Sequence, residues 1–186
     1  MVGRFAAVGY GTPWVDLLSG QGIPVPIDAE ETPTILAAAP VDKLLAELRS
    51  GLIELGRRMP GTKIGVVGFG LGGTLLWQLL TAGEPIMAAA VPFYGLSPDT
   101  PDFTKSRAAV MAIYPEKDRK LNESQDNADT AMLRAKLVHR SMILPGTEDA
   151  FFNEADPRYD GAAATKAWQV TLDWFRQYLQ PSLAVR

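Results

Sequence analysis

The most constraining feature of this sequence is an uncharged run of twenty residues, from Ile64 to Gly83, that glycines interrupt. The run is long enough to span a bilayer, but six of its residues are glycines, several near its middle, where they disfavour a continuous helix. A strand, a glycine turn and a helix fit it better than a membrane span. We therefore expect a buried strand at Lys63–Val67 and a helix at Leu71–Ala82 that is buried on all sides.

Periodic apolar positions predict further elements on both sides of this run. Val41–Arg58 carries leucines at helical spacing with charged residues between them, which predicts an amphipathic helix. Other apolar stretches have the length of strands, and two more have helical periodicity. The strands are expected at Gly11–Val15, Pro85–Tyr94, Ala108–Tyr114 and Arg140–Leu144, and the helices at Ser124–Leu137, with Ser124 as a cap, and Gly161–Leu179.

Apolar strands that alternate with helices are typical of one fold class. They indicate an α/β protein with a mostly parallel sheet, about five strands here, and helices on both faces. A length of 186 residues predicts a single domain. The segment Asp16–Pro40, which contains Pro24, Pro26 and Pro33, is expected to be a long irregular connection.

Composition excludes several kinds of chemistry. The chain has no cysteine and one histidine, so disulfides, thiolate metal sites, a cysteine nucleophile and a multi-histidine metal centre are excluded. A net charge of -3 without a basic block argues against nucleic acid and anionic membranes as partners. The first residues show no cleavage site of a signal peptide, which predicts a cytoplasmic location. We expect neither cofactor nor metal.

The glycine turn between strand and helix allows two interpretations. Gly68, Gly70 and Gly73 have the G-x-G-x-x-G spacing of dinucleotide-binding turns, but the end of the next strand, Ala90–Gly95, has no acidic residue for the ribose, and none follows it before Asp99. The alternative is the nucleophile elbow, a G-x-nucleophile-x-G turn in which Gly68 and Gly72 would be the flanking glycines. Gly70 then occupies the nucleophile position.

Around this turn the sequence resembles the dienelactone hydrolase family, which has the α/β-hydrolase fold. The similarity covers about residues 4 to 180, and it rests on the order and spacing of several segments more than on any one. These segments are Ile64–Gly73, Pro92–Gly95, Ile113–Asp118, Leu144–Asn153, Pro157–Asp160, Ala167–Trp168 and Leu172–Phe175. The resemblance implies one such domain over residues 1–186, lacking the family's first strands, and a carboxylic ester or lactone as substrate.

The resemblance also implies where the catalytic triad would lie. Asp118 matches the family's catalytic aspartate, whereas Gly70 replaces the nucleophile and Asp149 replaces the histidine. Glycine has no side chain to attack a carbonyl, and it relieves about 1–3 kcal/mol of backbone strain at an elbow. The only histidine, His139, is expected at the edge of the last strand, away from the turn. The triad is therefore incomplete, and little or no family-type hydrolysis is expected.

Three functions stay open from the sequence. The first is an ester or lactone hydrolase, as the family resemblance implies. The second is a non-catalytic protein that binds a small ligand in the family's catalytic cleft or a partner at a sheet edge. The third is a dinucleotide-binding oxidoreductase. A narrower alternative places Asp118 and Asp149, with Glu148 nearby, as an acid–base pair or cation site. The competing interpretation makes Asp149 and Glu148 solvated loop residues.

A missing strand has consequences for assembly. Without the family's first strands, Gly11–Val15 must pair with Lys63–Val67, find a partner in another chain, or stay frayed. Unpaired strand edges favour association, so a homodimer through this edge is one expectation. Ligand choice would depend on the 16–40 connection and on residues such as Tyr94 and Phe151.

Overall fold

A computed structural model of the chain describes all residues except 1, 13–14, 16, 18–34, 37 and 181–186. It divides into two compact units, Met1–Gly61 and Thr62–Arg186, which we describe separately. The single-domain expectation stays a prediction.

The first unit contains helices α1 (Val2–Ala7) and α3 (Val41–Arg58), and the bounds of α3 are those predicted. Glu54 pairs with Arg57 and Arg58 in the last turn of α3, at 2.8 and 2.7 Å. Their hydrogen bonds lower the pKa of Glu54 to about 2. This pairing places positive charge near the negative end of the helix dipole.

The strand expected at Gly11–Val15 is not found in the described part of that stretch. Gly11, Thr12 and Val15 lie in no strand, and residues 13–14 are outside the described residues. Most of the expected 16–40 connection is likewise outside them.

The second unit is a parallel sheet of four strands in the order β1-β2-β3-β4. The strands are β1 (Ile64–Phe69), β2 (Met87–Phe93), β3 (Ala109–Pro115) and β4 (His139–Leu144). The helices are α4 (Leu71–Ala82), α5 (Arg119–Arg134) and α6 (Gly161–Leu179). This confirms the α/β class and the parallel sheet, but the described strands number four where about five were expected, because no strand forms in the described part of Gly11–Val15.

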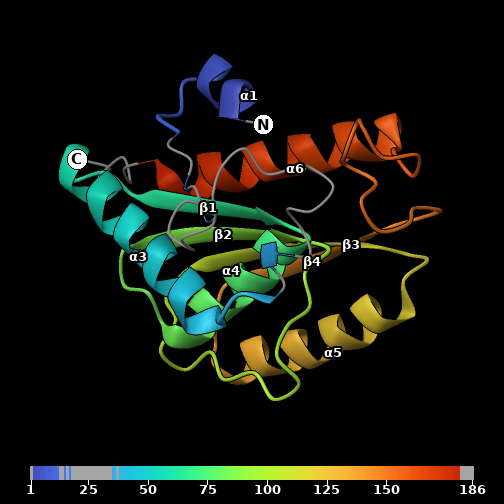
Figure 1. Cartoon of the computed structure of the whole chain (residues 1–186), viewed down its shortest axis with the longest axis horizontal. Coiled ribbons are helices and arrows are strands. Elements are labelled where there is room, and N and C mark those ends of the chain that lie inside the picture. Colours follow the sequence, from blue (N-terminus) through green and yellow to red (C-terminus); the bar gives the residue numbers. More distant parts are fainter. Residues whose placement is uncertain (1, 13–14, 16, 18–34, 37, 181–186) are drawn as a thin grey trace, which may run out of the picture. The chain divides into compact units, whose positions relative to one another are not determined.

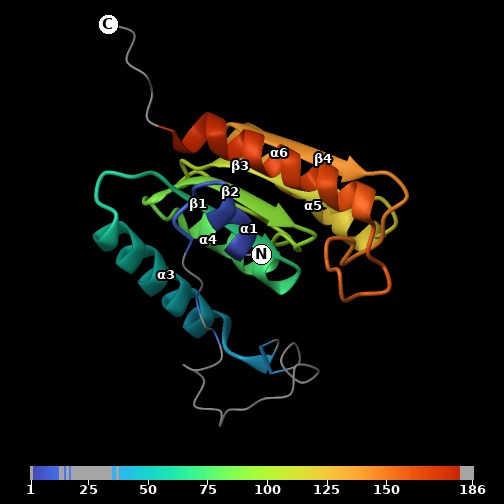
Figure 2. The same cartoon turned by 90° about the horizontal axis from the view of Figure 1, so that it is seen from above.

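Helices cover both faces of this sheet, as the apolar strands require. Figure 1 and Figure 2 show α6 on one face and α4 and α5 on the other. Every residue of β3 is buried, and all but one of β2. The leucine-rich α4 is buried around Leu76 and Trp77, the latter with no exposed surface. The core of this unit therefore lies between the two inner strands and the helices on each face, α6 on one and α4 with α5 on the other.

The prediction for α5 was wrong at both ends. The helix begins at Arg119 and ends at Arg134, with Asp118 as its N-cap. The expected cap, Ser124, lies inside the helix, where its hydroxyl accepts a hydrogen bond from the N–H of Ser97 at 2.7 Å. The buried face follows Leu121, Gln125, Ala128 and Met132, a helical spacing that starts before Ser124.

The uncharged run from Ile64 to Gly83 is a strand followed by a turn and a helix, as predicted. Within the described residues, no helix combines the length and the apolar character that crossing a bilayer needs.

Candidate functional site

The turn that joins β1 to α4, residues Phe69–Leu71, is called the elbow below. Gly70 lies at its centre with φ 53° and ψ -116°, and it begins α4 without a side-chain cap. Its N–H donates to the carbonyl of Phe93 at 3.1 Å, and its carbonyl accepts from the N–H of Thr74 at 3.0 Å. The elbow is therefore fixed to the end of β2 and to the first turn of the helix.

Two glycines beside the elbow are required by close backbone packing. A Cβ on Gly68 would lie 2.2 Å from the carbonyl oxygen of Gly72, and one on Gly73 would lie 2.6 Å from that of Phe93. Real Cβ atoms do not approach backbone this closely. Packing of β1 against the first turn of α4 thus accounts for Gly68, and packing of that turn against β2 accounts for Gly73, without a bound nucleotide.

Few atoms of the described residues lie near the Cβ position of Gly70, its two chain neighbours aside. A Cβ at this position would meet only one described atom within 4 Å, the Cε2 ring carbon of Tyr94 at 3.8 Å. A Cβ at Gly72 would meet nothing within that distance. The elbow therefore has room for a side chain at position 70 that the sequence does not supply.

A cluster of aromatic rings lies next to the elbow, and we call it the aromatic cluster. Phe69 contacts Phe93 and Phe152, with ring centroids 4.5 and 5.3 Å apart. Tyr94 packs edge-on against Phe151 at 5.4 Å. These rings come from β1, the end of β2 and the loop after β4, so they join three segments around Gly70.

Tyr94 is the polar member of this cluster. It has φ 36°, which few non-glycine residues adopt, and its N–H donates to the carbonyl of Ile113 at 2.8 Å. Only 7% of the residue is exposed. Burial raises the pKa of Tyr94, and the negative charges of Asp149 and Asp156 raise it further. Its hydroxyl is therefore protonated at neutral pH.

Asp149, at the predicted histidine position, is engaged in its own loop. One oxygen accepts from the N–H of Ala150 at 2.8 Å, and the other lies 3.7 Å from a guanidinium nitrogen of Arg158. Arg158 also forms a two-point contact with Asp156, with both hydrogen bonds at 2.8 Å. These bonds lower the pKa of Asp156 to about 2. Arg158 was not singled out from the sequence, where only its place in a resembling segment marked it.

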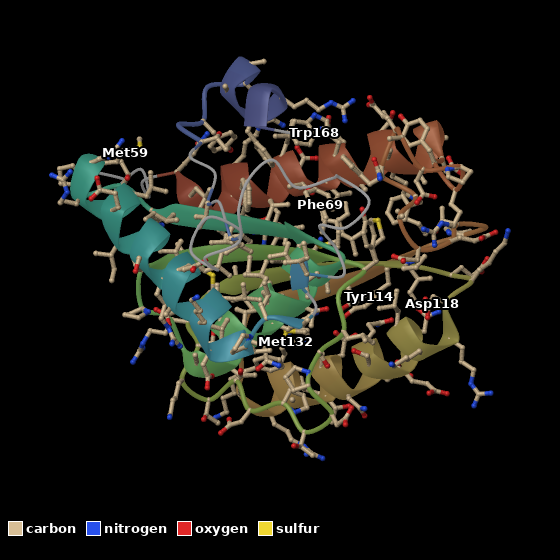
Figure 3. The ribbon with its side chains drawn as sticks, viewed as in Figure 1. Met59, Phe69, Tyr114, Asp118, Met132 and Trp168 are labelled. Atoms are coloured by element: carbon tan, nitrogen blue, oxygen red, sulfur yellow. The ribbon has the colours of Figure 1, made fainter. Side chains whose placement is uncertain are left out.

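Asp118 lies just beyond the end of β3, at the start of α5 (Figure 3). Its carboxylate caps that helix by accepting from the N–H of Leu121 at 3.0 Å. Asp118 and Asp149 thus follow neighbouring strands, and each carboxylate has a backbone donor of its own. The predicted acid–base pair of Asp118 and Asp149 stays a prediction.

Glu148 lies beside Asp149 and is paired with Lys117 at 3.9 Å, with both side chains more than half exposed. Exposed pairs at this distance contribute little stability. Across the described part of the chain, no group of three or more histidine, cysteine or acidic side chains is arranged to hold a metal ion.

His139 is the first residue of β4, an edge strand, and its Nδ1 lies 2.9 Å from the carbonyl of Leu137. The carboxyl end of β4 is five residues away, about 16 Å along a strand. The expectation that His139 is a strand-edge residue is confirmed.

Comparison with known proteins shows to which family this chain belongs. A family model described as the dienelactone hydrolase family matches residues 1–179. The chain belongs to the dienelactone hydrolase family. Two similar proteins are Protein usf of Aquifex pyrophilus and a carboxymethylenebutenolidase homolog of Mus musculus, both 30% identical to it. The matches cover 95% and 96% of this chain, and 78% and 75% of those proteins.

Solved structures show the same fold. A dienelactone hydrolase-like promiscuous phosphotriesterase from metagenomic libraries superposes with a TM-score of 0.73 at 18% identity, covering 95% of this chain and 78% of that one. Dienelactone hydrolase from Anabaena variabilis has a TM-score of 0.60 at 19% identity, covering 89% and 71%. This member of the dienelactone hydrolase family therefore has the elbow in its expected place, between β1 and α4, with glycine at its centre.

Proposed function

We propose that this dienelactone hydrolase family member binds a small carboxylic ester, a lactone or the corresponding acid at the elbow, and that it does not cleave the ligand through an acyl-enzyme. The observation that carries the proposal is Gly70, which stands at the centre of the elbow, where a Cβ would meet no described atom outside its chain neighbours closer than 3.8 Å. Position 70 has the backbone geometry of an elbow but no side chain. A ligand atom can therefore lie where the nucleophile of the family would stand.

The proposal rests on the three positions that the family resemblance assigns to a triad. Covalent hydrolysis needs a nucleophile and a base that takes its proton. Gly70 has no nucleophilic atom, and Asp149 at the histidine position is held by Ala150 and Arg158. Asp118 remains at the acid position, but it has no histidine to orient and instead caps α5.

The surroundings of the elbow support ligand binding. The aromatic cluster offers apolar ring surface beside Gly70, and Tyr94 adds one hydroxyl at the edge of that surface. Aromatic surface with few polar groups is the usual lining of small-molecule sites. No observation in the described residues favours the dinucleotide alternative over this one.

Exposure to p-nitrophenyl acetate tests the absence of an acyl-enzyme. We expect no burst of p-nitrophenol from the natural chain and no acetyl mass increase on the peptide that contains Gly70. Any slow release should persist in Asp118→Ala, because it would come from surface groups. Turnover that disappears in Asp118→Ala, or an acetylated elbow in the natural chain, would contradict the proposal.

A variant that restores the nucleophile and the histidine of the family provides the matched comparison with the natural chain. The Cβ position at Gly70 lies 3.8 Å from the nearest described atom outside its chain neighbours, so Gly70→Cys meets no steric clash, although the positive φ makes any side chain there strained. With Asp149→His in the same chain, we expect the elbow cysteine to be acetylated, and Gly70→Cys alone to react more slowly. A folded double variant without acetylation would show that the elbow has lost more than two side chains.

We also propose that the second edge of β1 pairs with another copy of the chain. No strand in the described residues pairs with that edge, and β1 contains no charged residue. The opposite edge strand, β4, carries His139 and Arg140. Charged residues are a common protection of exposed sheet edges, so β1 is the less protected of the two.

A further inference from the structure

We propose that the free edge of β4 binds an acidic, extended segment of a partner protein, which would join the sheet as an additional strand. The surface consists of β4 and of residues 133–138, from the end of α5 to the start of the strand, and we call it the basic edge. This inference goes beyond the proposed function, because it involves neither the elbow nor the aromatic cluster. The two proposals can therefore fail independently.

The backbone of β4 has hydrogen-bonding groups for another strand. In the described part of the chain β4 has a strand partner, β3, on one side only, and it lies at the outer edge of the sheet (Figure 2). The carbonyl of Val138, just before β4, accepts from the N–H of Val110 in β3 at 2.9 Å, and the register with β3 continues without a break to Leu144. Backbone groups of successive strand residues point to alternate sides. Those that point away from β3, and to which no backbone group of the described residues is bonded, belong to His139, Ser141 and Ile143.

Three permanent positive charges lie around the start of β4. Arg134 is the last residue of α5, Lys136 lies in the turn that follows, and Arg140 is the second residue of β4. Between residues 130 and 147 the sequence contains no acidic residue, although the whole chain has a net charge of -3. None of the three forms an ion pair within the part of the chain that the structure describes. Arg134 opposes the dipole of α5, but Lys136 and Arg140 have no comparable role in the fold.

Lys136 has a backbone conformation that favours glycine. Its φ is 56°, and its N–H donates to the carbonyl of Leu133 at 3.0 Å, where α5 ends. Glycine is the usual residue in this conformation after a helix, because a side chain there has a cost in free energy. The sequence nevertheless has a lysine, whose charge lies at the start of the basic edge. A role in binding explains why a charged side chain stands at this position.

Apolar side chains accompany these charges. Leu133, Val138 and Ile143 are 71%, 53% and 43% exposed, more than any other large apolar residue described in the second unit. A partner that covers them would remove apolar surface from water, which favours association. Exposed apolar side chains surrounded by charged ones are typical of surfaces that bind a protein.

The two faces of β4 indicate the kind of strand that fits. The hydroxyl of Ser141 donates to Asp129 of α5, so Ser141 and Ile143 lie on the α5 face and Arg140 lies on the opposite face. An added strand in which acidic and apolar residues alternate would place a carboxylate beside Arg140 and an apolar side chain beside Ile143. A second copy of β4 would instead bring positive charges together. Lipid headgroups could meet the charges, but they would not form a ladder of backbone hydrogen bonds.

Titration with a synthetic peptide tests the basic edge. The probe is a capped peptide of the length of β4 in which glutamate and valine alternate, and affinity is measured by calorimetry on the full chain. We expect this peptide to bind, and a peptide with lysine in place of glutamate to bind at least about fivefold more weakly.

A charge reversal on β4 provides the first variant. Arg140→Glu should weaken binding of the glutamate–valine peptide about fivefold or more, because a favourable charge pair between neighbouring strands becomes a repulsive one. Lys120→Glu is the matched control. It makes the same change of charge at an exposed position at the opposite end of α5 from Arg134, and it should leave the affinity unchanged.

A proline on β4 tests the backbone contribution. Ile143→Pro removes an N–H that points away from β3, so it should abolish peptide binding while the pairing with β3 is preserved. Ile143→Ala removes the same apolar side chain but keeps the N–H, and it should still bind. A second readout needs no variant: in ¹⁵N spectra of the natural chain, the peptide should shift the amides of Ser141 and Ile143 and slow their exchange with solvent. This readout decides the matter if Ile143→Pro does not fold.

Several results would overturn the basic edge as a site for an acidic strand. They are absence of peptide binding at millimolar concentration, equal affinity for the lysine peptide, equal effects of Arg140→Glu and Lys120→Glu, and amide shifts away from β4. Phosphatidylserine vesicles that bind the natural chain but not Arg140→Glu, without peptide binding, would show a membrane partner instead. A dimer that Met142→Lys dissociates would place a second copy at β4, which also contradicts the proposal.

Discussion

Gly70 has a backbone conformation that other residues adopt only at a cost in free energy. Its φ of 53° combined with a ψ of -116° lies outside the regions that side chains allow. Family members that keep a nucleophile there would bear this strain as part of their active site. In this chain glycine relieves the strain, which fits our proposal that position 70 does not serve covalent chemistry.

Substitution by alanine at two neighbouring glycines separates backbone strain from lack of space. Gly70→Ala should lower the free energy of unfolding by about 1–3 kcal/mol, although a Cβ would meet no close atom. Gly72→Ala, inside α4 and also in open space, should raise it by up to about 1 kcal/mol. Urea unfolding of both variants measures the difference. Equal effects at the two positions would show that the backbone at Gly70 is not strained.

At the scale of single elements, the N-cap of α5 is a residue that the family resemblance assigns to the triad. Asp118 follows β3 and would be a triad member by resemblance, but here its carboxylate satisfies the N–H of Leu121. A similar cap begins α6, where Asp160 accepts from Ala162 and Ala163. Aspartate is among the preferred N-cap residues, so its retention at position 118 needs no catalytic reason.

The capping role of Asp118 predicts a pattern of three substitutions. Asp118→Ala should destabilise the fold by about 0.5–2 kcal/mol, whereas Asp118→Asn should nearly preserve stability because asparagine caps equally well. The exposed Asp126, within the same helix, provides the control, and Asp126→Ala should change stability by less than about 0.5 kcal/mol. Thermal unfolding distinguishes the three. If Asp118→Asn were as destabilising as Asp118→Ala, the carboxylate charge would matter beyond the cap.

At the scale of the whole molecule, the sheet has two edges of different character. The inner strands β2 and β3 are buried almost throughout, whereas β1 and β4 each have one side without a strand partner in the described residues. Association through an edge extends a sheet at little cost, because the unpaired backbone groups are already in place.

Sedimentation measures whether the β1 edge pairs two copies of the chain. We expect the natural chain to sediment as a dimer and Val66→Lys, on β1, to shift it toward monomer. Met142→Lys, on the opposite edge strand β4, should leave the dimer intact and so controls for the added charge. A natural chain that sediments as a monomer at all concentrations would refute the pairing.

Local patterns in the sequence were sufficient for most elements. The helices α3, α4 and α6 have the predicted bounds, because leucine spacing, glycine and charged ends mark them within the segment itself. The start of α5 was missed because the cap at Asp118 was assigned to catalysis by resemblance. The roles of Gly68 and Gly73 also needed coordinates, since the backbone atoms that exclude their Cβ atoms include one on β2, twenty residues further along the chain.

The sequence by itself determined the fold class, the family and the absence of a nucleophile at residue 70, because each is encoded in residue type and order. Only the tertiary structure decided what surrounds that position. The burial of Tyr94, the ion pair of Asp149 with Arg158 and the few described atoms near the Cβ position of Gly70 depend on which distant segments meet. Location in the cell stays a prediction. Packing between elements that are distant in the sequence determines which partners a side chain has. A local sequence pattern therefore does not predict them.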